Sequence, residues 1–287
     1  MKRILVACVL AFMLPAMPCA SDDVGALLDK ALDQLGRNGY QGDTSAAERY
    51  LRAILEQQPD HLEAQWQLLY IQLAPLRNTP LSERAPALAA LSPAFARLAK
   101  LAKEPKQQAF LHFMTATHAG LYCDYERALA EIDRAVALEP RSVRYLTAKG
   151  NLLVDDGNWT DSDTEIEKGI SILKTTQELS RTQPSPFARD ESYEFQLAVA
   201  ISDLSQPRWQ EVAEHYLRFI EKSPESVTYA FAWNNVSIAY RRLGECDKAK
   251  EAAEKALAVT KFGAAQWNKR YAEFCLEMQK AGLIAKQ

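Results

Sequence analysis

Apolar and small residues recur at intervals of three and four through most of this 287-residue chain. That spacing places them on one face of an α-helix. The pattern is clearest between Tyr122 and Pro140, where it covers Tyr125, Ala128, Leu129, Ile132, Ala135, Val136 and Leu138. Asp124 can cap the start of this helix, and Pro140 lies just past its end. Because a single helix of this length cannot bury its own apolar face, the pattern predicts stacked copies.

The same periodicity predicts helices over residues 22–37, 45–58, 61–73, 94–103, 106–121, 124–138, 143–156, 161–173, 191–204, 208–222, 227–243, 247–259 and 266–281. No segment alternates between apolar and polar residues, so we predict essentially no sheet. Two segments interrupt the pattern. Residues 74–103 hold four prolines and form a predicted irregular insertion, with a loop and short helical pieces before the helix over 94–103. Residues 174–190 are rich in Thr, Ser and Pro, which predicts a mobile surface loop.

A search for a fixed period aligns several of these helices. The clearest unit consists of Trp233, Val236, Ser237, Tyr240, Gly244, Ala249, Ala253 and Ala256. Less complete units contain Ala128, Ala135 and Pro140, and then Gly150, Leu153, Gly157, Trp159, Ser162 and Gly169. On these residues the chain resembles the tetratricopeptide repeat (TPR) family, whose 34-residue helix–turn–helix unit carries the pattern W-x2-L-G-x2-Y…A-x3-F…P.

The resemblance implies an all-α fold, a right-handed α-solenoid of antiparallel helix pairs with a C-terminal capping helix. Residues 21–287 would form a single domain of about six pairs, interrupted by the insertion at 74–103 and the loop at 174–190. The capping helix carries Trp267, Tyr271, Phe274 and Met278 at helical spacing. Its charged residues suit the outer side of a cap, and they include Lys269, Arg270, Glu273 and Lys280.

The first twenty residues are typical of a secretory signal peptide. Lys2 and Arg3 precede an apolar run that is too short to span a bilayer, and we predict cleavage after Ala20. An alternative is that Cys19 becomes a lipid-anchored first residue. No later segment is long and apolar enough for a membrane, so we expect an exported, periplasmic protein without a transmembrane segment.

The net charge of the chain argues against one class of partner. Without the signal peptide the chain has 32 basic and 37 acidic residues, which argues against a nucleic-acid partner.

Three cysteines remain after removal of the signal peptide, so at least one is unpaired within the chain. If the chain reverses near Phe262, Cys275 lies about one helical turn from Cys246, and a disulfide between them would contribute about 3 kcal/mol. The alternative is that both are small buried residues.

The sequence contains no pattern typical of catalysis or of a cofactor or metal site. Its four histidines form neither His-x-x-x-His nor His-Glu-x-x-His. It also lacks Cys-x-x-Cys, a Gly-x-Ser-x-Gly elbow and a Gly-rich phosphate loop. We therefore predict no cofactor, no metal and no enzymatic activity.

The resemblance implies that the first helix of each pair lines a concave groove. Carried over residue by residue, this predicts a partner groove of Phe113, Thr117, Thr147, Asn151, Asn234, Asn235, Ile238, Arg241 and Arg242. Met114, Asp155, Leu197 and Ile201 lie on the same helices, and for the apolar ones packing between helices is the alternative. An Asn at position 235 would bind a peptide backbone through its amide. Ile238 stands where capture of a free C-terminus would need a polar residue.

These observations predict an exported, non-enzymatic scaffold that holds another protein, through a peptide segment or an amphipathic helix. One alternative is a periplasmic accessory protein that binds an apolar small ligand or a lipid for a transport system. The other is an enzyme whose site lies in 74–103 or 174–190.

Overall fold

The computed structural model describes residues 23–38, 43–183, 190–223 and 228–285, so the predicted signal peptide, residues 1–20, lies outside the described residues. Within these ranges the regular elements are helices and none is a strand. They are α1 (Val24–Asn38), α2 (Ser45–Gln57), α3 (Leu62–Leu73), η1 (Ala74–Asn78), α4 (Leu81–Ala90), α5 (Ser92–Leu101), α6 (Pro105–Leu121), α7 (Tyr125–Leu138), α8 (Val143–Thr160), α9 (Asp163–Thr182), α10 (Asp190–Ser202), α11 (Trp209–Lys222), α12 (Tyr229–Arg242), α13 (Cys246–Val259) and α14 (Gly263–Lys280). The predicted all-α fold is confirmed. Among the described helices, none combines the length and apolarity that crossing a bilayer requires.

The helices divide into two compact units, one ending at Pro75 and the other beginning at Leu76. The first unit holds α1, α2 and α3, with α2 packed against both of the others. Its core combines large aliphatic side chains with alanines, among them Leu27, Ala31, Leu35, Ala47, Leu51 and Ile54. The sequence predicts one domain over 21–287, and the division falls at the start of the irregular segment 74–103, where the repeat spacing is interrupted.

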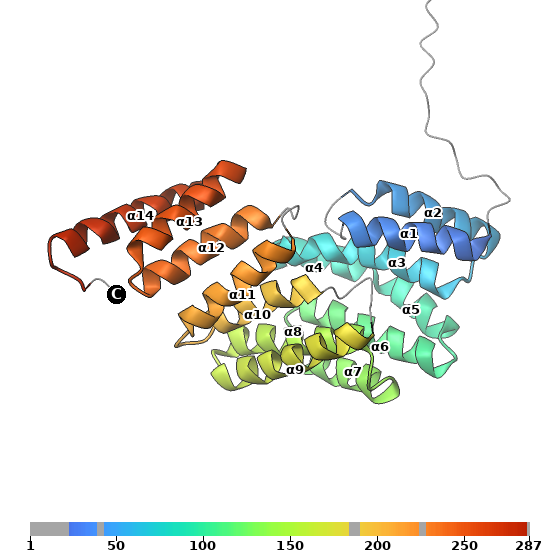
Figure 1. Ribbon diagram of the computed structural model, residues 1–287. Coiled ribbons are helices and arrows are strands. Elements are labelled where there is room, and N and C mark those ends of the chain that lie inside the picture. The colour runs from blue at the N-terminus through green and yellow to red at the C-terminus, as the bar shows by residue number, and fades with distance from the viewer. Residues whose placement is uncertain (1–22, 39–42, 184–189, 224–227, 286–287) are drawn as a thin grey trace, which may run out of the picture. The chain divides into compact units, whose positions relative to one another are not determined.

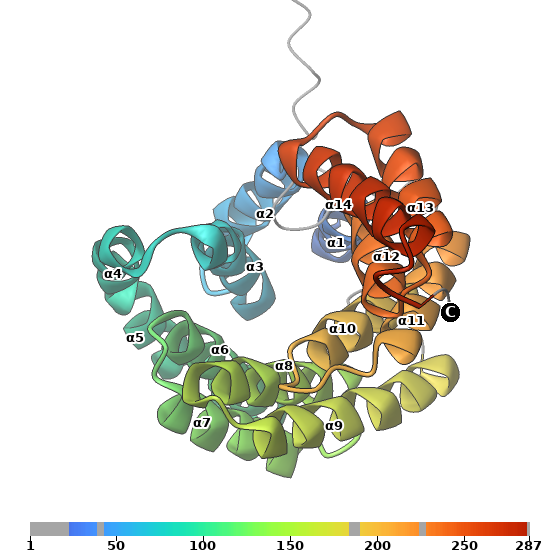
Figure 2. The same ribbon diagram turned by 90° about the vertical axis from the view of Figure 1, so that its left-hand side faces the viewer.

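The second unit contains a row of helix pairs. α6 packs with α7, α8 with α9, α10 with α11, and α12 with α13. The second helix of each pair packs on the first helix of the next pair, and α14 packs on both α12 and α13 (Figure 1). Figure 2 shows α12, α13 and α14 side by side in this unit. This is the predicted solenoid of helix pairs with a capping helix.

The helix that is most legible in the sequence, α7, forms as expected. The Asp124 carboxylate accepts a hydrogen bond from the Arg127 backbone N–H at 3.3 Å, which caps the first turn. Ala128, Ile132 and Ala135 on its apolar face are fully buried. The cap and the periodicity were both readable in the sequence, and together they explain why this helix begins and packs where it does.

The turns inside three of the pairs share a left-handed residue. Cys123, Asp161 and Gly244 have φ angles of 60°, 55° and 77° and lie between the two helices of their pairs. Only Gly adopts this region without a steric cost from Cβ. Two of the three turns therefore carry a strained residue where the third has Gly.

The α8–α9 pair requires glycine for a different reason. A Cβ added to Gly169 would lie 2.7 Å from the Gly150 carbonyl oxygen, and one added to Gly150 would lie 2.8 Å from Leu173 Cγ. The two backbones therefore approach too closely for any larger residue. Gly157 is inside α8, because that helix continues to Thr160 and does not end at residue 156 as predicted.

The predicted loop over 174–190 is wrong in its first half, since α9 continues to Thr182. Several buried residues of this extension are polar, and for that reason the hydrophobic periodicity does not predict it. Thr176 Oγ1 donates to the Ile172 carbonyl and Ser180 Oγ to the Gln177 carbonyl, both at 2.7 Å. Such bonds allow polar side chains to be buried on a helix. Residues 184–189 of the predicted loop lie outside the described residues.

The irregular segment 74–103 is more helical than predicted, because α4 forms despite Pro86. Polar side chains from α6 and the turn after it hold α4 in place. The Tyr122 hydroxyl donates to the Ala85 carbonyl at 3.1 Å, and His118 Nε2 lies 3.2 Å from the Leu88 carbonyl oxygen. These two contacts hold the backbone of α4 against α6 and the turn that follows it.

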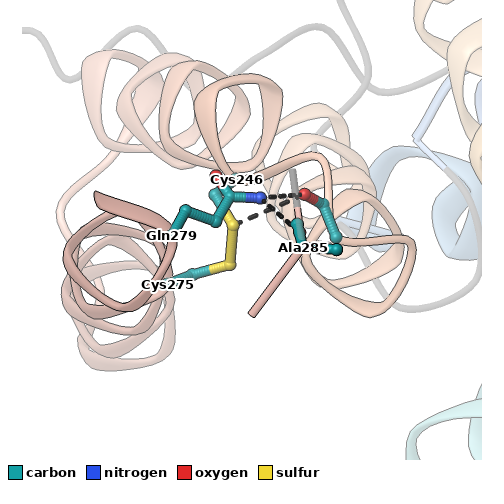
Figure 3. The surroundings of a disulfide bond; sticks show 5 residues. Cys246, Cys275, Gln279 and Ala285 are labelled. Carbon is teal, nitrogen blue, oxygen red and sulfur yellow. Dashed lines mark hydrogen bonds between the residues drawn. A yellow bond between two sulfur atoms is a disulfide. The ribbon is translucent and has the colours of Figure 1, made fainter. Parts of the chain in front are cut away.

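Of the two possibilities left open for Cys246 and Cys275, the disulfide is confirmed, with the Cα atoms 5.6 Å apart. It joins the start of α13 to α14 (Figure 3). Beside it the Gln279 amide donates to the Gly244 carbonyl at 2.8 Å and to the Ala285 carbonyl at 3.2 Å (Figure 3). The capping helix is therefore fixed by a covalent bond as well as by packing.

Candidate partner-binding surface

The nine predicted groove residues fall in two groups, one on α6 and α8 and one on α12, with α10 and α11 between them. In the first group the aromatic side chain joins two helices. The Phe113 ring is buried, and its centroid lies 5.5 Å from that of Tyr145 on α8. Thr147 Oγ1 on α8 lies 2.6 Å from the hydroxyl of Tyr193 on α10. Both side chains therefore contribute to contacts between helices.

The other two members of the first group, Thr117 and Asn151, form no side-chain hydrogen bond to another described helix. Thr117 Oγ1 donates to the Phe113 carbonyl one turn earlier at 3.0 Å, so its hydroxyl is satisfied by its own helix. Asn151 is half-buried, and its side-chain amide has no hydrogen-bond partner in the described part of the chain. Of this group, Asn151 is the polar side chain with unused bonding capacity.

The two asparagines of the second group are bonded within the fold. Asn234 is buried, and its side-chain oxygen accepts from the Asn268 amide of α14 at 2.8 Å. The Asn235 amide donates to the Tyr216 hydroxyl of α11 at 2.9 Å. Burial raises the pKa of Tyr216 to about 12, so its hydroxyl stays neutral. These amides position α12 against α11 and α14, while Ile238 beside them is half-buried.

The two arginines of the second group lie on aromatic rings. The Arg241 guanidinium is 5.5 Å from the ring centroid of Tyr271, and that of Arg242 is 5.6 Å from Trp209. Neither forms an ion pair with a carboxylate among the described residues, and Arg241 Nε is buried without a hydrogen-bond partner there. Burial lowers the pKa of Arg241, and the neighbouring charge of Arg242 lowers it further. Two oriented cations with unused donors therefore mark this end of α12.

The aromatic residues expected on the capping helix form a stripe on α14 that is exposed, which the sequence did not predict. Trp267, Tyr271 and Phe274 are 57%, 52% and 59% exposed. The buried face of α14 consists instead of Ala265, Ala272 and Cys275. Two of the charged residues predicted for the outer side face α13, because Lys269 lies 3.0 Å from Glu254 and Glu273 lies 3.9 Å from Lys250. The signal was present as a second stripe of small residues at helical spacing.

The apolar side chains that shared the groove helices belong to the core. Met114, Leu197 and Ile201 are fully buried, so for them the packing alternative is the one that the structure supports. Asp155, on α8, is paired with Arg77 at 3.0 Å. Burial raises the pKa of Asp155, and the Arg77 guanidinium partly offsets that effect.

A buried carboxylate that the sequence did not indicate lies between α9, α10 and α11. Glu194 accepts from Gln177 Nε2 at 3.0 Å and Arg218 Nε at 2.9 Å, and lies 2.7 Å from His215 Nδ1. Lys222 Nζ is 3.4 Å away. Burial alone would raise the pKa of Glu194, but these hydrogen bonds outweigh it and hold the pKa well below its ordinary value. Because each carboxylate oxygen has partners, this network positions helices and leaves no open reactive group.

Within the described ranges, no group of three or more His, Cys, Asp or Glu side chains could hold a metal ion. The geometry therefore offers two features for binding a partner: the arginines at the end of α12 and the aromatic stripe on α14. Since α12 and α14 pack together, both features lie at the C-terminal end of the second unit (Figure 2).

Comparison with known proteins bears on the fold. No protein-family model matches the chain, and no curated protein matches its sequence. Among solved structures, a signal-transduction ATPase with a tetratricopeptide repeat sensor from Pyrococcus horikoshii has a TM-score of 0.58 at 10% identity, over 89% of this chain and 37% of that one.

Two other solved structures are similar over most of this chain. A tetratricopeptide repeat protein from Parabacteroides merdae has a TM-score of 0.46 at 14% identity, over 92% of this chain and 94% of that one. Yeast Tom70 has a TM-score of 0.49 at 12% identity, over 90% of this chain and 56% of that one.

The fold class of the protein follows from its helix pairs and from the similarity to the Pyrococcus horikoshii ATPase. The protein has a tetratricopeptide-like fold, an all-α solenoid of helix pairs. A likeness at 10% identity concerns the arrangement of the helices alone, and the chain spans about a third of that ATPase. What the solenoid binds has to be argued from its own surface.

Proposed function

We propose that this protein is an exported, non-enzymatic scaffold that binds an acidic segment of another protein at the C-terminal end of α12. The observation that carries the proposal is the state of Arg241 and Arg242. Each guanidinium is held on an aromatic ring, and neither has an ion-pair partner among the described residues. A stacked guanidinium still presents its N–H donors in the plane of the group, where a carboxylate accepts two of them.

The position of these arginines favours a peptide or a helix over a small molecule. Arg241 reaches toward α14 and Arg242 toward α11, so one ligand that engages both must extend across α12. An extended segment or an amphipathic helix with carboxylates and apolar side chains has that reach. The asparagine contact predicted for Asn235 is less available, because its amide is bonded to Tyr216.

Export to a periplasm rests on the first twenty residues and is part of the proposal. Lys2, Arg3 and the apolar run after them have the order of a secretory signal. The disulfide between Cys246 and Cys275 is compatible with an oxidising compartment. Fractionation of cells that express the tagged chain tests this part, and a full-length chain that stays in the cytoplasm would contradict it.

The binding site is tested by capture from the native envelope with the tagged protein. We expect Arg241→Ala and Arg242→Ala each to weaken retention of a stoichiometric protein partner about tenfold, since each removes a charge-assisted bond. Arg141→Ala is the matched control, because Arg141 is an exposed arginine in the turn between α7 and α8. Circular dichroism should show the same helix content for all three variants.

Two results would overturn the proposal. One is full retention of the partner by both α12 variants. The other is co-purification of a lipid or another apolar ligand in place of a protein, which would support the transport-accessory alternative.

A further inference from the structure

The exposed stripe on α14 occupies the same register as α12, the first helix of the α12–α13 pair. Trp267 lies 34 residues after Trp233, and Phe274 lies 34 residues after Tyr240. In the α12–α13 pair, side chains of the second helix, α13, cover both rings. Lys255 Nζ lies 4.5 Å from the ring centroid of Trp233, and Lys248 Nζ lies 5.3 Å from that of Tyr240. On α14 the corresponding rings stay more than half exposed, although the Arg270 guanidinium of the same helix lies 5.2 Å from the ring centroid of Trp267.

No helix of the described chain covers this face. Residues 281–285, which follow α14, are exposed and not helical. A second helix packed as closely as α13 is on α12 would not fit here either. In α12 the close approach occurs at Ser237, whose hydroxyl donates to the Ala249 carbonyl at 2.7 Å, and Tyr271 occupies that register position on α14. The occupant must therefore interdigitate with large rings.

The charges beside the stripe indicate which occupant fits. Arg270 and Glu277 lie seven residues apart, and residues two turns apart share one flank of a helix. Both are exposed, and neither forms an ion pair with another described residue. In an antiparallel pair of identical helices that cross near Phe274, Arg270 of each copy faces Glu277 of the other. The flank is therefore complementary to itself.

We propose that α14 is the contact surface of a symmetric, antiparallel dimer, with the aromatic stripes interdigitated and two reciprocal Arg270–Glu277 pairs at their edge. Such an interface is isologous, so both copies contribute the same residues. An aromatic side chain buries about 150–250 Å², so three rings exposed by a little over half offer roughly 250–400 Å² per copy. A stable interface buries about 800 Å² per partner, so the dimer should be weak and reversible.

Sedimentation velocity on the purified full chain, over a concentration series through the micromolar range, measures the dimer. Arg270→Glu alone, or Glu277→Arg alone, replaces two attractive pairs with two repulsive ones. We expect each to raise the dissociation constant about tenfold. The double variant Arg270→Glu/Glu277→Arg restores both pairs with their signs exchanged, and it should dimerise within about threefold of the unmodified chain.

Two further variants complete the series. Phe274→Ser removes the ring at the crossing point and should leave a monomer, with helix content checked by circular dichroism. Lys280→Glu is the matched control, because it reverses an exposed charge on the same helix away from the stripe, and it should leave the dissociation constant unchanged.

A monomer at every concentration would overturn the proposal. So would single reversals without effect, or a double reversal that fails to recover dimerisation. Tyr271 belongs to the stripe and also carries the Arg241 guanidinium. None of the dimer variants changes Tyr271, Arg241 or Arg242, so capture by the α12 variants remains a separate test of the proposed partner site.

Discussion

Two contacts between helices in the second unit differ in the kinds of side chain that they bury. We call the contact of α9, α10 and α11 around Glu194 the ionic joint, and the contact of α12, α13 and α14 the alanine joint. The ionic joint buries large side chains together with one carboxylate, and these include Tyr193, Leu197, Ile201, Tyr216 and Phe219. The alanine joint buries Ala249, Ala252, Ala253, Ala256, Ala265 and Ala272.

Because the two joints bury different side chains, different interactions stabilise them. Alanine buries little apolar area, so its transfer free energy contributes less than that of a leucine or an aromatic residue. The alanine joint compensates with the Cys246–Cys275 disulfide. The ionic joint has ample apolar burial, but it holds a carboxylate that must stay charged. We therefore expect reduction to open the alanine joint and acid to loosen the ionic joint.

The largest effect should come from removing the disulfide. A cross-link between residues separated by 29 positions restricts the unfolded chain, and in the chain-entropy model this contributes about 3–4 kcal/mol. Cys246→Ala/Cys275→Ala should lower the free energy of unfolding by about that amount. Hydrogen exchange should become faster in α13 and α14 and stay unchanged in α10.

Cys123→Ala is the control, since it removes the free thiol of the second unit and no cross-link. If exchange in α14 is the same with and without the disulfide, the alanine packing is sufficient by itself. The contrast between the two joints would then be wrong.

A somewhat smaller effect is expected from Glu194→Gln. The substitution keeps the shape of the side chain but leaves Arg218 and Lys222 facing a neutral group. Breaking a buried ion pair costs about 3–5 kcal/mol, and the partial exposure of both cations reduces this to about 2–3 kcal/mol. Urea unfolding measures the change. Glu178→Gln, at an exposed pair with Arg181, should change stability by less than about 1 kcal/mol.

The same residue gives the ionic joint its pH dependence. The folded-state pKa of Glu194 is lowered, so its stabilisation is complete above the ordinary glutamate value of 4.5 and is lost as the pH falls below it. Exchange in α10 should therefore increase as the pH falls through the acid range, after correction for the intrinsic rate. In Glu194→Gln this response should be absent, and a variant that keeps it would refute the assignment.

The joints also show what the sequence could and could not predict. Helical spacing of apolar residues was enough to place the helix pairs, since a stacked helix must bury one face. It failed on α14, where the aromatic and the small residues both have helical spacing. The alanines of α13 leave room for a close approach, and only small residues on α14 can use it. Tertiary packing, which a single sequence does not display, decides which stripe is buried.

The polar parts of the fold were less predictable still. The end of α9 is buried through Thr176 and Ser180, whose hydroxyls bond the backbone of their own helix. Glu194 and its cations come from α10 and α11, and no local spacing identifies that pairing. All nine predicted groove residues lie on predicted helices, so Arg241 and Arg242 could be placed on a helix in advance. Their aromatic partners are on other helices and could not be.

The smallest effect is predicted at the turns of the pairs. Cys123 adopts a φ of 60° where the turn of the alanine joint has Gly244 at 77°. A left-handed Cβ costs about 1–2 kcal/mol, and glycine loses about 0.5–1 kcal/mol through its freer unfolded chain. The contact of Arg84 Nη2 with Cys123 Sγ at 3.2 Å is also lost on substitution. Cys123→Gly should therefore raise the free energy of unfolding by only about 0.5 kcal/mol, which thermal unfolding can resolve as a small increase in Tm.

Asp161→Gly provides the sharper comparison. Asp161 has a φ of 55°, and its side chain forms no bond to another described residue. If Cys123→Gly destabilises while Asp161→Gly stabilises, the Arg84 contact outweighs the strain, and the thiol then contributes to the stability of the α6–α7 pair.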